Sequence, residues 1–287
     1  MNATVFDDIV CDLGEGPLWH PQLGQLFWFD INAMRLYTRD GDATRHWQFD
    51  TPVSAAGWID DETLIVASAT ALLRFDLTTG TSEVITPLEQ DTPETRSNDG
   101  RADPWGGFWI GTMGRRGQRG AGSIYRYYKG ELRQLVWDVT CPNAICFSPE
   151  GAFAYYADTA MARIWRQRLD DVDGWPDGDP VVYLDLSSHG LNPDGAVVDA
   201  GGNMWVAQWG AYRVAAYAPD GRFITAVPFP AAHISCPAFG GSDLATLFTT
   251  SATKGLSAIE HAAQPQAGKT FVTRVSARGQ REHRVQL

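Results

Sequence analysis

Four oxygen-bearing side chains, those of Glu15, Asn98, Asn143 and Asp194, occur at matching points of a sequence pattern that returns along the chain. Carboxylates supply charged oxygens and an Asn carbonyl supplies a neutral one, so this set suits Ca²⁺, Mg²⁺ or Mn²⁺ with water completing the coordination shell. A cation would also relieve the repulsion between two carboxylates at close range, which otherwise raises one pKa strongly. With open coordination positions it can polarise a carbonyl group and lower the pKa of bound water. The chemistry indicated is the hydrolysis of an ester.

The elements that must bring these side chains together are the units of an internal repeat. Strand-forming runs and Gly-, Pro- and Asp-rich turns return roughly every 40 to 50 residues, which is the range of propeller blades. In the clear units, a turn leads to a second apolar strand, at residues 26–29, 108–112, 153–156 and 204–207. Third strands follow in several units. The pattern predicts an all-β fold, a β-propeller of about six blades with three to four strands in each.

A radial array converts a position in the repeat into a position in space, because equivalent residues form a ring around the axis. The residues that open the first strands are Glu15, Ser54, Asn98, Asn143, Asp194 and Cys236. If those strands are innermost, a polar ring with two carboxylates encloses a small water-accessible mouth. We expect one propeller domain over residues 1–287, sealed by strands near residues 4–10 and 271–275, because closure protects the sheet edges. Helix content should be small, since Gly and Pro recur too often for a sustained helical period.

The bulk composition excludes several other classes of protein. The chain has 287 residues, 44% of them hydrophobic, which is enough apolar material for a core. Its net charge of −11 repels phosphate backbones and anionic membranes, so neither nucleic acid nor a membrane is expected as a partner. The first ten residues lack the features of a secretion signal, and we expect a cytoplasmic protein. The four Cys lack zinc-site spacing and are expected to be buried thiols.

Four motifs occur in order at blade spacing: GEGPLW at residues 14–19, RSNDG at 96–100 with GTM at 111–113, PNA at 142–144, and PDG at 193–195. Together they resemble the regucalcin and gluconolactonase family over nearly the whole chain. The resemblance implies a six-bladed propeller that hydrolyses a sugar lactone to the aldonic acid with one divalent metal. The sequence leaves the metal open among Ca²⁺, Mg²⁺, Mn²⁺, Zn²⁺ and Fe²⁺, as it does the oligomeric state.

The resemblance also assigns roles to individual residues. Glu15, Asn143 and Asp194 would be metal ligands. Asp194 would in addition accept a proton from the water that attacks the lactone carbonyl. Arg96 and Asn98 would bind substrate oxygens.

One segment departs from the family pattern. The family often has an acidic residue in the loop after Gly-Thr-Met, whereas residues 114–122 contain Arg115, Arg116 and Arg119 and no acid. As a hypothesis, this cationic loop favours an acidic or sulfonated sugar lactone, because guanidinium groups pair with carboxylate or sulfonate through charge-assisted hydrogen bonds.

Plainer explanations remain open for the same residues. Asp-Gly pairs are common turn signals, so Asp194 could be structural, and Asn143 could hydrogen-bond a turn. Glu15 could be a solvated charge and Arg96 a surface cation. Asp99 could be structural or could support the ligands from behind. Most Trp residues, including Trp19, Trp28, Trp109 and Trp205, are expected to pack between blades rather than to stack on sugars.

Two rival functions also remain. A related propeller hydrolase acting on another ester or a phosphoester could use the same cation. A non-catalytic calcium-binding propeller would bind the ion without turnover.

Overall fold

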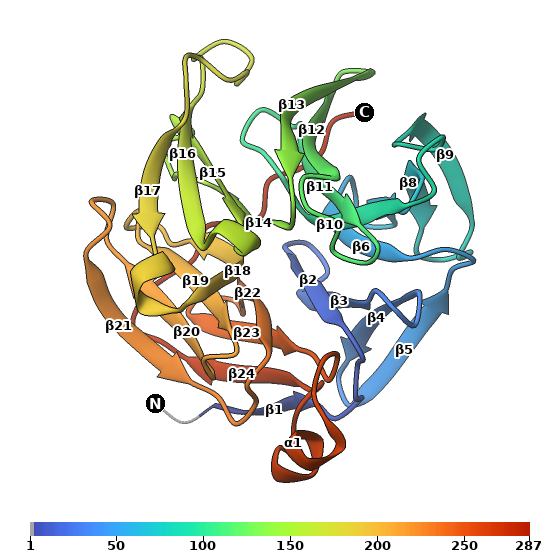
Figure 1. Ribbon diagram of the computed structural model, residues 1–287. Coiled ribbons are helices and arrows are strands. Elements are labelled where there is room, and N and C mark those ends of the chain that lie inside the picture. The colour runs from blue at the N-terminus through green and yellow to red at the C-terminus, as the bar shows by residue number, and fades with distance from the viewer. Residues whose placement is uncertain (1–2) are drawn as a thin grey trace.

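The computed structural model describes residues 3–287, whose strands form six four-stranded sheets arranged around a central axis (Figure 1). The six-bladed, all-β propeller predicted from the repeat is confirmed. Every blade has four strands, the upper end of the expected range. Only one α-helix lies in the described part of the chain, α1 (Ala258–Ala263), beside two 3-10 turns, η1 (Thr159–Met161) and η2 (Ser187–His189).

The blades are numbered here in the order of their first strands. Blade 1 is β2 (Gly14–His20), β3 (Gln25–Asp30), β4 (Arg35–Asp40) and β5 (Ala43–Gln48). Blade 2 is β6 (Val53–Trp58), β7 (Thr63–Ser68), β8 (Ala71–Asp76) and β9 (Ser82–Pro87). Blade 3 is β10 (Thr95–Ala102), β11 (Phe108–Gly114), β12 (Gly122–Tyr128) and β13 (Glu131–Val139). Blade 4 is β14 (Pro142–Phe147), β15 (Phe153–Asp158), β16 (Arg163–Arg168) and β17 (Val181–Asp185). Blade 5 is β18 (Asn192–Val198), β19 (Met204–Trp209), β20 (Arg213–Tyr217) and β21 (Phe223–Pro228). Blade 6 is β22 (Ile234–Gly240), β23 (Thr246–Ser251), β24 (Thr270–Arg274) and β1 (Thr4–Asp7).

The first strand of each blade is the innermost one. β2, β6, β10, β14, β18 and β22 each pack against the next in a closed ring. β6, β14 and β22 are buried along their whole length, whereas the fourth strand β5 is mostly exposed. A strand with a neighbouring sheet on both faces needs apolar residues on both, which explains the continuous runs of the inner strands.

Blade 6 combines strands from both ends of the chain. β1 pairs antiparallel with β24, with Thr4 opposite Val272 and Val5 opposite Phe271. Through β24 and β23 the amino-terminal strand is hydrogen-bonded into the sheet that begins at β22. This pairing covers the outer edge of β24 and joins the first blade to the last.

Aromatic side chains fill the space between blades. The Trp109 ring of blade 3 meets Phe147 of blade 4 edge-on, with centroids 5.6 Å apart, and Trp205 meets Phe239 of blade 6 at 5.8 Å. Both indoles are buried, as is Trp28. The expected packing role of these Trp residues is confirmed.

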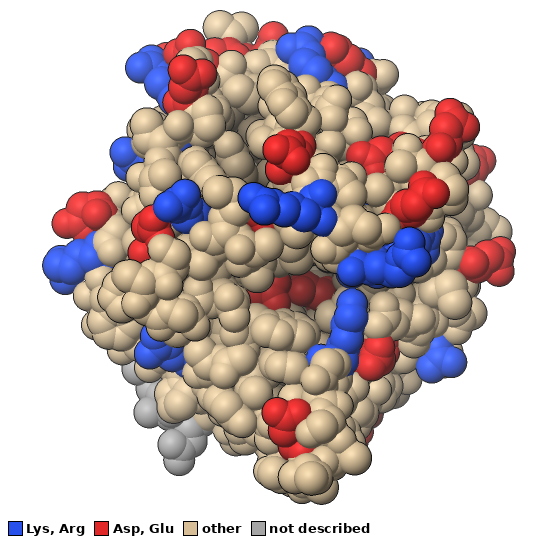
Figure 2. Space-filling model, in the orientation of Figure 1, with Lys and Arg blue, Asp and Glu red and all other residues tan. Residues whose placement is uncertain are grey.

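The two faces of the ring are closed differently. In the view of Figure 1 the molecule is hollowed at the centre, with acidic side chains in the depth of the hollow and basic ones around its rim (Figure 2).

None of the helices in residues 3–287 is both long and apolar enough to span a bilayer.

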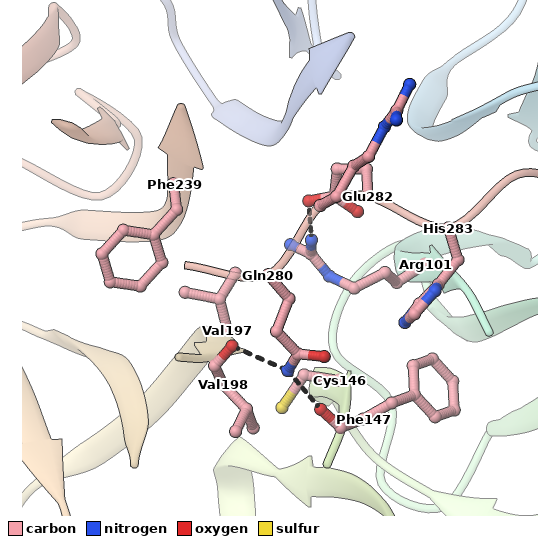
Figure 3. Close-up of a pocket in the computed structure, with 10 residues that line it drawn as sticks. Arg101, Cys146, Phe147, Val197, Val198, Phe239, Gln280, Glu282 and His283 are labelled. Atoms are coloured by element: carbon pink, nitrogen blue, oxygen red, sulfur yellow. Dashed lines mark hydrogen bonds and ion pairs between the residues drawn. The ribbon is translucent and has the colours of Figure 1, made fainter. Parts of the chain in front are cut away.

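The carboxy-terminal segment, residues 275–287, crosses the face where the innermost strands end. Gln280 Nε2 donates to the carbonyl oxygens of Phe147 and Val198, the last residues of β14 and β18, at 3.0 and 2.9 Å (Figure 3). Glu282 forms an ion pair with Arg101 of β10. Farther on, the amides of residues 285 and 286 donate to the carbonyls of residues 58 and 106. A cavity of only about 30 Å³ remains here, so the segment plugs this end of the channel.

Candidate active site

The site is built where the innermost strands begin, beside irregularities that recur in every blade. The pairing of first and second strands slips between Glu15 and Leu18, and likewise between residues 97 and 100, 143 and 146, and 193 and 196. Blades 2 and 6 slip at the equivalent place. A β-bulge breaks the regular alternation and re-aims the adjacent side chains. In blades 1, 3, 4 and 5, polar side chains beside the bulge line the cavity at the mouth of the channel.

The bulge in blade 1 places a backbone constraint on Gly16. Its φ is +53°, and an added Cβ would lie 2.3 Å from the Ser54 carbonyl oxygen of the next blade. Only glycine tolerates both the positive φ and the close approach. The second Gly of the GEGPLW motif thus allows Glu15 to sit against blade 2.

The sequence-predicted residues converge on one cavity. Glu15, Arg96, Asn98, Asn143 and Asp194, from four different blades, all line a space of about 410 Å³ at the mouth of the channel. Each is buried, retaining 2–6% of its exposure. This is the hollow with the acidic interior in Figure 2. Glu15 and Arg96 are therefore neither solvated charges nor surface cations, and the plainer explanations for them are excluded.

A chain of hydrogen bonds fixes the carboxamides. Arg96 Nη1 donates to Asn98 Oδ1 at 2.8 Å, and Asn98 Nδ2 donates to Asn143 Oδ1 at 3.0 Å. Asn143 Nδ2 donates to Thr159 Oγ1 at 2.8 Å, and this hydroxyl donates to the Pro193 carbonyl at 2.6 Å. The chain ends one residue before Asp194. Because the Asn143 amide nitrogen is held by Thr159, its Oδ1 has a defined direction and one lone pair left for a ligand.

The side chain of Asn98 forms more hydrogen bonds to main-chain and Arg groups than that of Asn143. Its Nδ2 also donates to the Pro142 carbonyl at 2.9 Å, so both amide protons are engaged within the protein. Its Oδ1 accepts from Arg96 and retains one lone pair, which can accept a hydroxyl proton from a ligand.

Burial and mutual repulsion disfavour the charged forms of the two carboxylates. Burial, and then the charge of Asp99, raise the pKa of Glu15 to about 8, against the Gly16 amide and Arg96. Burial, followed by the charges of Glu15 and Asp99, raises the pKa of Asp194 well above its ordinary value. Neither forms an ion pair with a basic side chain within residues 3–287. A divalent cation between them would remove both penalties.

The donor set is oxygen-rich and includes an amide. Across residues 3–287, no group of three His, Cys, Asp or Glu side chains converges as a metal cluster. The candidate centre consists of the Glu15 and Asp194 carboxylates with the Asn143 carbonyl oxygen. Such a set fits a hard cation that keeps several water ligands.

Asp99 belongs to the scaffold. Its Oδ2 accepts from the Ile145 amide at 2.7 Å, which ties β10 to β14, and it does not line the cavity. Burial raises its pKa to about 6, although the Ile145 amide and Arg101 favour the charged form. Asp99 thus ties two innermost strands together, and its negative charge contributes to the raised pKa values of Glu15 and Asp194.

The cationic loop lies outside the cavity. Arg115, Arg116 and Arg119 are all exposed, and none is among the described residues that line the space. Arg115 Nε donates to the Pro93 carbonyl at 2.9 Å and is near enough to Arg96 for its charge to contribute to a lowered Arg96 pKa, after burial. The loop therefore contributes charge at the rim.

Several cavity residues escaped the sequence analysis. Thr159, Trp209 and Lys254 line the cavity from the ends of the second strands β15 and β19 or the loop after β23. Because strands alternate in direction, the second strand of a blade ends on the face where the first begins. Inspection of the ends of the predicted second strands could therefore have identified Thr159 and Trp209 from the sequence. Cys141, expected to be a buried thiol, is only half-buried and lines the same cavity, while Cys11, Cys146 and Cys236 are buried as expected.

Comparison with known proteins decides the family. A family model described as "SMP-30/Gluconolactonase/LRE-like region" matches residues 13–253, a segment that contains all five predicted site residues. The chain belongs to this family. The resemblance inferred from the four motifs is thereby confirmed.

Several proteins with related names match along almost the full chain. The 6-deoxy-6-sulfogluconolactonase of Pseudomonas putida is 34% identical over 271 residues, 93% of this chain and 92% of that protein. The L-arabinolactonase of Azospirillum brasilense is 34% identical over 285 residues, 96% and 93% of the two chains. The crystal structure of a calcium-binding protein, regucalcin, from Agrobacterium tumefaciens str. C58 superimposes with a TM-score of 0.97 at 38% identity, covering 99% and 97%.

Proposed function

We propose that the protein hydrolyses a sugar lactone to the aldonic acid with one divalent cation held by Glu15, Asn143 and Asp194. The observation that carries this proposal is the convergence of two buried, mutually repelling carboxylates and one oriented carboxamide oxygen on a cavity of about 410 Å³. Relatives that share about a third of its residues are named for the hydrolysis of sugar lactones. When bound, the cation would polarise the lactone carbonyl and acidify a water molecule.

The side chains of this protein divide the remaining work. Asp194, whose carboxylate lines the cavity, accepts the proton of the attacking water. Arg96 uses only Nη1 in hydrogen bonds within the described protein, so Nε and Nη2 can donate to substrate oxygens. Asn98 accepts a sugar hydroxyl through Oδ1 and also orients Asn143.

The decisive experiment is lactone hydrolysis by metal-free protein reconstituted in turn with Ca²⁺, Mg²⁺, Mn²⁺, Zn²⁺ and Fe²⁺. We expect turnover of gluconolactone to return with at least one ion, and phosphotriesters to be turned over far less. Turnover of phosphotriesters alone would indicate the related hydrolase. Tight calcium binding without turnover of any lactone would indicate a binding protein.

Replacing the proposed base tests the mechanism. Asp194→Asn should lower kcat by roughly 10²- to 10⁴-fold, which is the usual contribution of a general base. The fold should persist, because the substitution removes a buried charge without changing the shape of the side chain. Asp185→Asn is a matched control, since Asp185 is exposed and paired with Arg163 at 2.9 Å. Near-normal turnover by Asp194→Asn, with the melting temperature preserved, would contradict the assignment.

A further inference from the structure

The cavity is lined by two cationic side chains that have no acidic partner. Arg96 is buried with only 4% exposure, and Lys254 lies at the exposed mouth, on the loop that follows β23. Neither forms an ion pair with a carboxylate in the part of the chain that the structure describes. The guanidinium groups of Arg101 and Arg126, which are also withdrawn from solvent, each pair with a carboxylate. Arg96 therefore differs from them in having no carboxylate within ion-pair distance, although the charge of Glu15 favours its charged form.

The backbone of Lys254 is held in place on both sides. Its amide donates to the Asp12 carbonyl at 2.8 Å, and its own carbonyl accepts from His233 Nδ1 at 3.0 Å. The His233 ring stacks on Trp209, with centroids 4.1 Å apart, and both rings line the cavity. The backbone of Lys254 is therefore fixed in the cavity wall, and a ligand needs to order only the side chain that carries the ammonium group.

The two cations repel each other across the cavity. Partial burial, and then the charge of Arg96, lower the pKa of Lys254, while the nearby Asp12 opposes this. The Asp12 carboxylate accepts from Asn32 and Thr253 rather than from Lys254. An arrangement that places like charges together and leaves their donors free is typical of a site for an anion.

We propose that Lys254 is a specificity-determining residue that selects lactones bearing an anionic group on the carbon farthest from the ring carbonyl, with Arg96 completing the recognition. This rests on the proposed function, and it names the substrate class: an acidic sugar lactone with a terminal carboxylate, sulfonate or phosphate. The lactone carbonyl lies over the acidic floor, and the anionic end lies at the basic rim seen in Figure 2. A flexible ammonium suits this position because it acts as a point charge at a partly hydrated mouth.

This assignment places anion recognition on Lys254 and Arg96 rather than on Arg116 and Arg119 of the loop at residues 114–122. Arg116 and Arg119 are exposed and do not line the cavity, so water and salt screen their charges from a bound substrate. Arg96 lies inside the cavity and Lys254 at its mouth, so both can reach a bound substrate directly.

The test compares gluconolactone with its analogues that carry a carboxylate, a sulfonate or a phosphate at C6. The wild-type enzyme should have a higher kcat/KM for at least one anionic analogue, mainly through a lower KM. Lys254→Met should reduce the ratio of anionic to neutral kcat/KM about tenfold, as expected for one charge-assisted contact. Lys254→Arg should retain most of the preference. The three anions then show which terminal group fits.

Two controls carry the same loss of charge elsewhere. Lys129→Met alters an exposed Lys on the turn between β12 and β13, and Arg116→Met alters the exposed loop. Both should keep the wild-type ratio. A ratio lowered by Arg116→Met but not by Lys254→Met would overturn the proposal and restore the loop as the determinant.

A binding measurement separates this inference from the proposed function. Calorimetry of metal-free protein should show gluconate 6-phosphate binding more tightly than gluconate, with the difference lost in Lys254→Met. If the reconstituted enzyme hydrolyses no lactone, the proposed function fails while this binding result still decides the role of Lys254. If neutral and anionic lactones are turned over equally, or Lys254→Met leaves the ratio unchanged, the inference fails and the lactonase stands.

Discussion

The hydroxyl group of Thr159 orients the carboxamide of Asn143 in the site. Asn is often a turn residue because its amide satisfies nearby backbone groups. Here Thr159 Oγ1 accepts the Asn143 amide proton at 2.8 Å and donates its own proton to the Pro193 carbonyl. The carboxamide is thereby oriented by a hydroxyl that is itself anchored to the neighbouring blade, and its oxygen is left for a ligand.

This orientation can be tested by removing the hydroxyl. Thr159→Val should weaken cation binding and lower kcat/KM by roughly 10- to 100-fold, because groups that orient metal ligands typically contribute that much. The measurements are a calorimetric titration with the activating cation and steady-state kinetics. Thr159→Ser keeps the hydroxyl and should remain close to wild type. Unchanged cation affinity in the Val variant would contradict the role of Thr159 in orienting Asn143 as a ligand.

Protons should compete with the cation at Glu15. Its pKa in the folded, metal-free protein is raised to about 8, mainly by burial and then by Asp99. Below that pH the cation must displace a proton from Glu15, and the raised pKa of Asp194 adds a second proton to displace, so its apparent affinity should rise with pH. The same shift means that metal-free protein loses stability as pH rises from 4.5, the ordinary pKa of a Glu side chain, toward 8, since the folded state binds the extra proton. Calorimetric titrations between pH 5 and pH 9 measure the first effect, and a flat profile would contradict the raised pKa.

At the scale of the elements, the recurring β-bulge orients polar side chains of different blades into one site. A regular strand would send alternate side chains into the spaces between blades, where only apolar residues are stable. A slip beside each polar residue turns it toward the axis instead. In blade 1 this slip requires a glycine with positive φ.

Gly16→Ala should therefore be strongly destabilising, by roughly 2–5 kcal/mol, because it combines a strained φ with a clash against the Ser54 carbonyl. Gly24 is a matched control, since its φ is +65° but nothing lies within 4 Å of an added Cβ. Gly24→Ala should cost only about 1 kcal/mol. Urea denaturation measures both, and equal costs would mean that the contact with blade 2 relaxes easily.

At the scale of the whole molecule, the carboxy-terminal segment closes one end of the channel and leaves the other open for chemistry. It contacts the ends of innermost strands in blades 2, 4 and 5, and its Glu282 pairs with the buried Arg101 guanidinium of blade 3. The segment also links blades that are distant in the ring.

Breaking the Arg101–Glu282 pair tests this plug. Glu282→Ala should lower the free energy of unfolding by about 3–5 kcal/mol, because it leaves a buried guanidinium without its counter-charge. The double variant Arg101→Met, Glu282→Ala should recover much of that loss, since no uncompensated charge remains. Equilibrium denaturation gives both values. A loss below about 1 kcal/mol in the single variant would show that Arg101 finds water or another partner.

Much of the architecture was accessible from the sequence because repeats carry local information. The turn residues and apolar runs predicted six blades and the positions of their first and second strands, and these agree with the structure. The residues Glu15, Arg96, Asn98, Asn143 and Asp194 were singled out by repeat position and motif, and the structure brings them to one cavity. Their catalytic and ligand roles remain predictions.

Lys254 could not be identified from the repeat. It stands outside the repeated positions, and neither its type nor its spacing separates it from an ordinary surface lysine. The sequence by itself determined the ring and its polar residues, because equivalent positions in a closed repeat must share a distance from the axis. Only the tertiary structure decided that Asp99 faces the scaffold, that Arg116 and Arg119 lie outside the cavity, and that Lys254 and Arg96 share it. Those facts depend on loop conformations and bulges, which are set by packing between blades rather than by neighbours along the chain.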